Sequence, residues 1–318
     1  MENNISLFEK VKYKIQDRML IGSVYDTAIK KIKYRESKLS FLYNVMIAQK
    51  HRMLYYKRLK NKYLKKCTEK REWEELPKEN KSDTIWICWF QGADNAPELV
   101  KTCIESVRKN LPEKKIVILH KDNIFEYIKI PDDIVEKWKN GTIGMAHFSD
   151  IIRLEILIKY GGYWIDSTVL CTDAGAIKYY DKLPLFMYSF YYFGFNPEIM
   201  ETNNWFIKSC TNNNILCLMR EFLYSYWRDH NRVLDYFFFH IFMTIALEFY
   251  DEEYKKMPIV SQVDAHVLAT YIYDDYDEEK YELLKLQTGF HKLSTRFEKE
   301  KSDKKDTFYQ KIVKEKAF

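Results

Sequence analysis

Near the middle of the chain, the apolar residues change from helical spacing to a continuous run. Ile151, Leu154 and Ile158 recur at the spacing of one helix face. Gly161-Gly162 is expected to end that helix, because glycine accepts the positive φ that a helix C-terminus needs. The aromatic and β-branched run Tyr163–Ile165 then reads as a strand. The pattern therefore predicts a helix, a glycine turn and a buried strand.

Two further apolar runs have the length of buried strands. Residues 84–90 (TIWICWF) are followed by a glycine turn, and residues 115–120 (KIVILH) form the second run. Continuous runs of this kind are typical of central strands in a parallel sheet. Between these runs and the strand at 163–165, helices are predicted over residues 97–110, after Asp122-Asn123 and over residues 131–139. This order of elements favours an α/β fold, with residues 84–172 as a nucleotide-binding half.

The pattern is less regular beyond residue 172. Residues 183–195 are rich in aromatics and predict strands that line a cleft. Helices are expected over residues 212–227 and 236–250, and residues 289–293 are expected to be the last ordered motif before a charged tail. We therefore predict one domain over residues 78–318, with residues 173–318 as its second half.

The N-terminal region has a different pattern and a different charge. Residues 36–72 predict one long helix, whose heptad seam is broken at Gln49 and Lys60. Residues 1–71 hold 19 Lys/Arg and 6 Asp/Glu, whereas the rest of the chain holds 32 and 40. We therefore predict a separate basic helical region over residues 1–77. It could be a solvated helix packed on the main domain, an oligomer contact, or a surface for an anionic membrane through residues 1–71. A nucleic-acid role is not expected, because no recognised motif accompanies the charge.

The composition indicates how large the core is and in which cellular compartment the protein is expected. The 318 residues include 25 Tyr, 20 Phe and 7 Trp but few Gly and Pro, which argues for a substantial core and against long disorder. Six cysteines show no CxxC pair, so we interpret them as reduced thiols of a cytoplasmic protein. No apolar run reaches the roughly 18 residues of a membrane span, and the N-terminus does not resemble a signal peptide.

The candidate chemistry lies where the predicted strands end. Asp166 directly follows a buried strand, and a buried carboxylate costs several kcal/mol unless it is paired or binds a metal. Asp150 and Arg153 share one face of the preceding helix. One interpretation is a structural Asp166–Arg153 ion pair, and the other is a divalent cation that holds a diphosphate. At the same sheet edge we expect the end of the first strand, which is Trp89-Phe90-Gln91, with Lys292 or His291 across the cleft.

Four segments together carry a resemblance to a known family. The segments are IWICWFQG, SDIIRLEILIKYGGYWIDST, NNWF and FHKL, within residues 84–293. They resemble the capsular polysaccharide synthesis glycosyltransferases, which are related to the sugar transferases with a DXD motif. The resemblance implies a GT-A fold, a UDP-sugar donor and retention of the anomeric configuration. No GxSxG, HExxH, P-loop or GxGxxG motif points to another class.

The resemblance also assigns roles to residues. It implies that Asp150 and Arg153 hold the donor sugar and that Asp166 binds Mn²⁺ or Mg²⁺. The second motif aspartate is replaced by Thr168, which adds no charge, so we expect weaker metal affinity and more reliance on Lys292 and His291. The expected metal ligands are Asp166, Thr168 and His291, and the expected donor contacts are Trp89, Phe90, Gln91, Trp164, Ser167 and Lys292.

The expected reaction moves a hexose, galactose or glucose, to a lipid-linked oligosaccharide in bacterial capsule synthesis. The expected location is the inner face of the cell membrane. Two alternatives stay open at this point. One is a non-catalytic, membrane-docked scaffold with a degenerate transferase domain, and the other is a sugar-phosphate transferase.

Overall fold

The computed structural model describes residues 37–81, 83–191, 199–295 and 302–318, with a few single positions between 11 and 29. The chain divides into two compact units, Met1–Tyr55 and Tyr56–Phe318. Most of the basic and apolar stretch at residues 5–33 lies outside the described residues. The predicted domain boundary at residues 77/78 stays a prediction.

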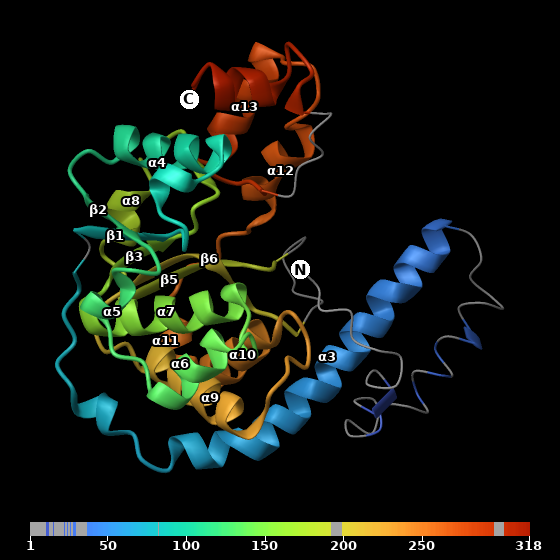
Figure 1. The fold of residues 1–318 in the computed structure, drawn as a ribbon, viewed down its shortest axis with the longest axis vertical. Coiled ribbons are helices and arrows are strands. Elements are labelled where there is room, and N and C mark those ends of the chain that lie inside the picture. The colour runs from blue at the N-terminus through green and yellow to red at the C-terminus, as the bar shows by residue number, and fades with distance from the viewer. Residues whose placement is uncertain are drawn as a thin grey trace. The chain divides into compact units, whose positions relative to one another are not determined.

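A five-stranded sheet forms the centre of the second unit, in the order β2-β1-β3-β6-β5 (Figure 1). Strands β2, β1 and β3 are parallel, and β6 and β5 continue the sheet in antiparallel pairing. Trp86 in β1 pairs with Val117 on one side and Trp164 on the other. The predicted α/β fold is therefore confirmed. The bounds are β1 Thr84–Cys88, β2 Lys115–Leu119, β3 Gly162–Ile165, β5 Leu185–Ser189 and β6 Thr202–Ser209.

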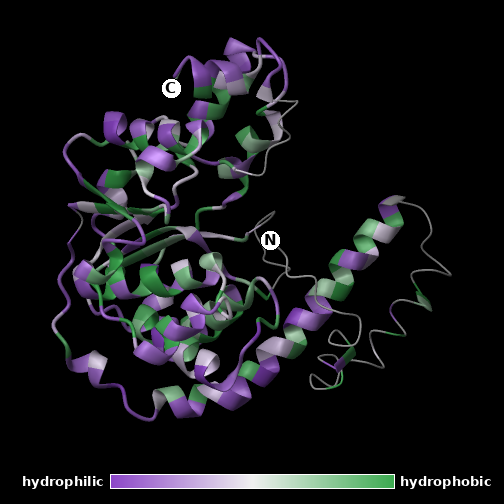
Figure 2. Ribbon diagram, in the orientation of Figure 1, coloured by the Kyte–Doolittle hydropathy of each residue, from purple (hydrophilic) through white to green (hydrophobic). Residues whose placement is uncertain are grey.

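Helices cover both faces of this sheet (Figure 1). One face carries the helices α6, α7, α9 and α10, and α7 and α10 both pack on α9. The other face carries α4 and α8, while α12 and α13 lie beyond them toward the C-terminus. The bounds are α4 Glu98–Asn110, α5 Ile124–Tyr127, α6 Asp132–Lys139, α7 Met145–Tyr160, α8 Ile177–Tyr180, α9 Asn214–Asp229, α10 Phe238–Phe249, α11 Asp251–Tyr254, α12 Val263–Tyr271 and α13 Glu278–Gln287. Apolar residues gather on the sheet and the helix faces toward it, and polar residues on the outer faces (Figure 2).

The glycine turn between α7 and β3 is needed for space as well as for backbone angle. Gly161 and Gly162 both have positive φ, 65° and 89°. A Cβ at Gly162 would lie 2.4 Å from the carbonyl oxygen of Thr84 in the neighbouring strand. Two glycines therefore let the chain pass from α7 straight into the centre of the sheet.

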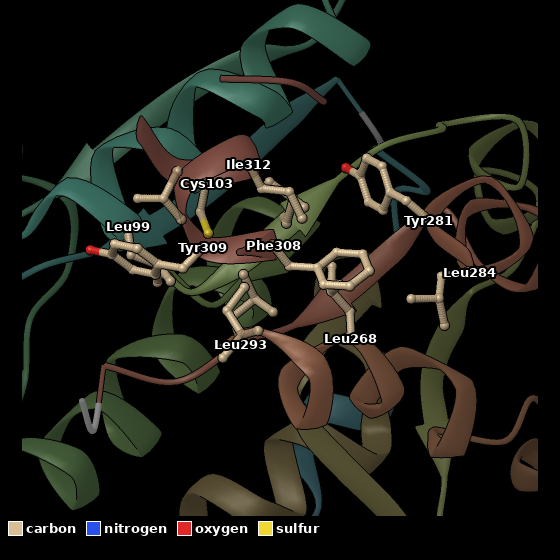
Figure 3. Close-up of a cluster of buried hydrophobic side chains, with 12 residues drawn as sticks. Leu99, Cys103, Leu268, Tyr281, Leu284, Leu293, Phe308, Tyr309 and Ile312 are labelled. Atoms are coloured by element: carbon tan, nitrogen blue, oxygen red, sulfur yellow. The ribbon is translucent and has the colours of Figure 1, made fainter. Parts of the chain in front are cut away.

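The end of the chain belongs to the core, and our expectation that residues 289–293 are the last ordered motif is wrong. Phe308, Tyr309 and Ile312 are buried against Leu99 and Cys103 of α4 (Figure 3). The charged residues of the tail hid this apolar spacing. The same cluster supports a two-stranded sheet of β4 (Val169–Cys171) and β7 (Phe290–Lys292), because Leu170 and Leu293 belong to it.

The long helix α3 (Ser37–Thr68) confirms the helix predicted over residues 36–72. It contains no acidic residue. Its last part packs within the second unit, where Tyr63 is fully buried and its hydroxyl donates to Asp229 at 3.0 Å. No helix among the described residues is both long enough and apolar enough to cross a membrane.

Candidate active site

A cavity of about 500 Å³ opens where β1 and β3 end. Ligands of open α/β sheets bind in this position, beyond the carboxyl ends of the parallel strands. Trp89, Phe90 and Gln91 follow β1 and line one wall, and Asp166, Ser167 and Thr168 follow β3 and line another. Helix α7 adds Asp150 and Arg153, and β7 adds Lys292. The structure therefore brings together every predicted site residue except His291.

Arg153 lies between the two carboxylates. Its guanidinium nitrogens are 3.4 Å from Oδ1 of Asp150 and 3.6 Å from Oδ1 of Asp166. It also donates to the backbone carbonyl of Asn204 at 2.7 Å, and it lies 5.0 Å from the centre of the Trp164 ring. Only 6% of the side chain is exposed. The predicted Asp166–Arg153 pair therefore exists, but it forms part of a larger arrangement that borders the cavity.

Asp166 faces two cations and one neutral donor. Its Oδ1 accepts a hydrogen bond from Trp164 Nε1 at 3.0 Å, and its Oδ2 lies 3.3 Å from Lys292 Nζ. Burial by itself would raise the pKa of this carboxyl group. The charges of Lys292 and Arg153, with the Trp164 hydrogen bond, outweigh burial and lower the pKa below its usual value. Asp166 is therefore ionised at neutral pH.

Lys292 is held from two sides. Its ammonium donates to Thr168 Oγ1 at 2.5 Å, in addition to its contact with Asp166. Its backbone is fixed by strand pairing with Val169, and the next amide, that of Leu293, donates to the Thr168 carbonyl at 2.9 Å. The flexible side chain of Lys292 is therefore held at its ammonium by two contacts, and its backbone is held by strand pairing.

His291 lies on the opposite side of β7 from Lys292, since successive strand residues point to opposite faces. Its ring is fully buried, does not line the cavity, and has Nε2 3.1 Å from Thr172 Oγ1. Burial lowers the pKa of this imidazole to about 4. Lys292 rather than His291 therefore lies on the cavity side of β7, and the structure does not place His291 beside Asp166. That His291 binds a metal stays a prediction.

The aromatic residues at the cavity differ in how much they offer a ligand. Phe90 lines the cavity but also packs with Trp138 and Phe148, with ring centroids 6.1 and 6.4 Å away. Trp89 has an indole nitrogen that is buried without a hydrogen-bond partner. Trp89 therefore keeps an unused donor at the end of β1, while the half-buried Phe90 already packs against two other rings.

Two residues that the sequence did not mark as site residues shape the same wall. Asn204 donates from Nδ2 to Asp150 Oδ1 at 2.9 Å, so one asparagine contacts Asp150 and, through its carbonyl, Arg153. His266 also lines the cavity, and burial lowers its pKa below the usual value. The NNWF segment was the available signal for Asn204. Nothing in the spacing around His266 separated it from a core histidine.

The donor set fits a divalent cation poorly. Among the described residues, no group of three or more His, Cys, Asp or Glu side chains could hold a metal ion. Asp166 supplies the one carboxylate near Thr168, and both of its oxygens already face cationic side chains. Mg²⁺ and Mn²⁺ prefer oxygen ligands that are free to face them. The predicted ligand set of Asp166, Thr168 and His291 is therefore not assembled.

The chain is similar to a solved structure and to a protein family. Among solved structures, the PaToxG glycosyltransferase is similar, with 17% sequence identity, a TM-score of 0.40, and coverage of 85% of this chain and 96% of that one. No curated protein matches the chain. Residues 35–312 match the family described as capsular polysaccharide synthesis protein. The chain belongs to the capsular polysaccharide synthesis protein family.

Proposed function

We propose that this protein is a glycosyltransferase that moves a hexose, galactose or glucose, from a UDP-sugar to a lipid-linked oligosaccharide of the capsule. One observation carries the proposal. Two carboxylates and two fixed cations meet in one cavity at the carboxyl ends of parallel strands. A nucleotide-sugar needs both kinds of group, because its diphosphate is anionic and its sugar is rich in hydroxyls.

The four charged groups have different proposed roles. Lys292 and Arg153 offset the charge that develops on the departing diphosphate. Asp150, already oriented by Asn204, accepts hydrogen bonds from sugar hydroxyls. A site built to bond a particular hydroxyl rejects sugars that lack it there, because a buried polar group is then left unpaired. Trp89 lies at the end of β1, where the base of the nucleotide would stack.

Retention of the anomeric configuration fits the same groups. Inversion would need a base on the face opposite the leaving group. Both carboxylates that line the cavity among the described residues are paired with Arg153, and Asp166 has a lowered pKa, which makes it a weak base. In a retaining reaction the acceptor hydroxyl can pass its proton to the leaving diphosphate on the same face.

The acceptor side of the proposal involves helix α3. Its residues Leu39, Phe41, Leu42 and Met46 are exposed, and the helix has basic but no acidic residues. Apolar and basic side chains together suit the interface of an anionic bilayer, where each Lys or Arg contributes roughly 1 kcal/mol. These features support our proposal that the protein acts at the inner face of the cell membrane, where a lipid-linked acceptor would be available.

The function is tested by a screen of nucleotide-sugars against the full chain. The true donor should raise the melting temperature and release nucleoside diphosphate slowly when no acceptor is present. A scaffold without activity would release nothing, and a sugar-phosphate transferase would release nucleoside monophosphate. Either result would contradict the proposal.

The membrane part has its own test in vesicles that contain phosphatidylglycerol. Changing the exposed Lys57, Lys65 and Lys66 to Gln should weaken binding by roughly 100-fold at low salt, because about 1 kcal/mol is lost per lysine. The matched control changes exposed Lys178, Lys256 and Lys305, which are outside α3. Equal losses in the two triple variants would rule out α3 as the contact.

A further inference from the structure

The ammonium group of Lys292 occupies the place where the related motif would hold a metal. It lies 2.5 Å from Thr168 Oγ1 and 3.3 Å from Asp166 Oδ2, the two side chains that the motif offers to a cation. A lysine nitrogen at such distances makes charge-assisted hydrogen bonds with both. The position between the carboxylate and the hydroxyl is therefore filled by a side chain of the protein itself.

The charges of the site are already balanced by this arrangement. Asp150 and Asp166 contribute two negative charges, and Arg153 and Lys292 contribute two positive charges, with both carboxylates within 3.6 Å of a cationic nitrogen. A divalent ion between Asp166 and Thr168 would have to displace the Lys292 ammonium, which already lies there. A diphosphate that enters the cavity can accept hydrogen bonds from the same ammonium without displacing it.

The backbone of Lys292 is also fixed, because it belongs to a paired strand. Strand β7 pairs with β4 in the register Val169–Lys292, and β4 directly follows the Asp166-Ser167-Thr168 turn. On the other face of β7, His291 is buried and contacts Thr172. Movement of the Lys292 backbone away from Asp166 would therefore disturb a paired strand and a buried histidine, and its ammonium is held at Asp166 and Thr168 by its own two contacts.

We propose that Lys292 takes the place of a divalent cation, so that the protein binds the diphosphate of its donor without a metal. This inference rests on the proposed function. In the transfer step, the bond between the anomeric carbon and the diphosphate oxygen breaks, and a bond to the acceptor oxygen forms. The acceptor proton goes to the diphosphate. Lys292 forms no bond in this step and supplies charge alone.

The experiment measures binding of UDP by calorimetry, in EDTA and in 1 mM Mn²⁺, to wild type, Lys292→Met, Asp166→Asn and a control, Lys178→Met. Lys178 is exposed and does not line the cavity. We expect wild type and the control to bind UDP equally in the two buffers, within about threefold. Lys292→Met should lose at least about tenfold in EDTA, since a charge-assisted contact to phosphate is removed. Asp166→Asn should keep its affinity within about threefold, because its lysine remains.

The outcomes separate the two proposals. Loss of UDP binding by wild type in EDTA with recovery in Mn²⁺, or loss by Asp166→Asn in both buffers, would overturn the built-in cation and leave the transferase proposal standing. Unchanged binding by Lys292→Met would overturn it as well. If wild type binds no nucleoside diphosphate in either buffer, the proposed function itself fails. Circular dichroism of each variant keeps loss of folding distinct from loss of binding.

Discussion

Two clusters of charged groups adjoin strand β3, one on each face of the sheet, and they are built from similar parts. The Asp181 cluster consists of Lys114, Tyr163, Asp181 and Lys208, and the Asp166 cluster consists of Arg153, Trp164, Asp166 and Lys292. Each has a carboxylate, two cations and one aromatic donor. Tyr163 and Trp164 are neighbours in the chain, so their side chains go to opposite faces.

The two clusters differ in how completely their hydrogen bonds are made. Lys114 Nζ lies 2.9 Å from both oxygens of Asp181, and Tyr163 donates to the same carboxylate at 2.6 Å. Lys208 is fully buried and donates to the carbonyl of Leu183 and to Asn80. No side chain of this cluster has a buried polar atom without a partner. The Asp181 cluster is therefore a fully hydrogen-bonded structural network.

The Asp166 cluster, by comparison, has hydrogen-bonding groups without partners. Its ion pairs are longer, at 3.3 and 3.6 Å, and Arg153 Nε has no hydrogen-bond partner. Two tryptophans that line the same cavity, Trp89 and Trp205, also have buried indole nitrogens without partners. Unsatisfied buried donors are costly in a network that serves stability alone. The comparison teaches that buried donors without a hydrogen-bond partner, rather than the presence of charge, distinguish a binding site from a purely structural cluster.

The largest expected effect is on catalysis and comes from Asp150→Asn. The amide keeps the size of the side chain but loses the charge that Arg153 and the sugar hydroxyls face. We expect kcat/KM for the donor found in the screen to fall by roughly 100-fold or more, about 3 kcal/mol. The unfolding free energy is measured as well, because Asp150 is the buried partner of Arg153 and its charge also contributes to stability. A variant with normal turnover would remove Asp150 from the site.

A smaller effect, on stability alone, is expected from Lys208→Met in the Asp181 cluster. Two acceptors, on the exposed Asn80 and the half-buried Leu183, lose the ammonium of the buried Lys208, and we expect unfolding in urea to show a loss of roughly 1–3 kcal/mol. Activity per folded molecule should stay the same. Lost activity at full stability would contradict the division between the two clusters.

This stability loss should depend on pH. Burial lowers the pKa of Lys208 to about 8, whereas an unfolded lysine titrates near pH 10.4. Between these values the unfolded chain binds more protons, so the contribution of Lys208 to wild-type stability rises with pH. The difference between wild type and Lys208→Met should therefore grow from pH 8 to pH 10.5. A constant difference would show that Lys208 does not titrate in this range.

The smallest effects come from a matched pair of neighbours. Tyr163→Phe removes the hydrogen bond to Asp181, and Trp164→Phe removes the hydrogen bond to Asp166. Each lost hydrogen bond should cost roughly 1 kcal/mol, the first in the free energy of unfolding and the second in the free energy of the transition state. We expect the first to lower the unfolding free energy with normal kcat/KM. The second should lower kcat/KM by about fivefold to tenfold. The reverse assignment would exchange the roles of the two clusters.

The sequence predicted the elements whose pattern is local. The run at residues 84–90, the turn at Gly161-Gly162 and the helix over residues 36–72 all formed, because periodicity and glycine conformation act within a few residues. The candidate site followed from the same logic. Residues at the ends of parallel strands meet at one edge, so Trp89 and Asp166 could be placed together before the structure was known.

What the sequence did not predict depends on long-range pairing. Whether His291 or Lys292 faces the cavity is set by the register of β7 on β4, and a shift of one residue would reverse the two. The burial of Phe308 and Ile312 depends on α4, which lies far away in the chain. Asn204 gained its role from the position of β6 next to β3. A local pattern such as the NNWF segment marks a residue such as Asn204, but it does not say which distant residue it contacts.

The support of β7 by the end of the chain has a consequence for synthesis on the ribosome. A nascent chain that has emerged through β6 already contains Asp150, Arg153 and Asp166, with the sheet that holds them. Lys292 comes later, and the Phe308–Val313 segment that covers its strand comes later still. The two carboxylates and Arg153 are therefore made first and Lys292 later, so a growing chain has no complete site for a nucleotide-sugar until the segment that covers β7 has also been made.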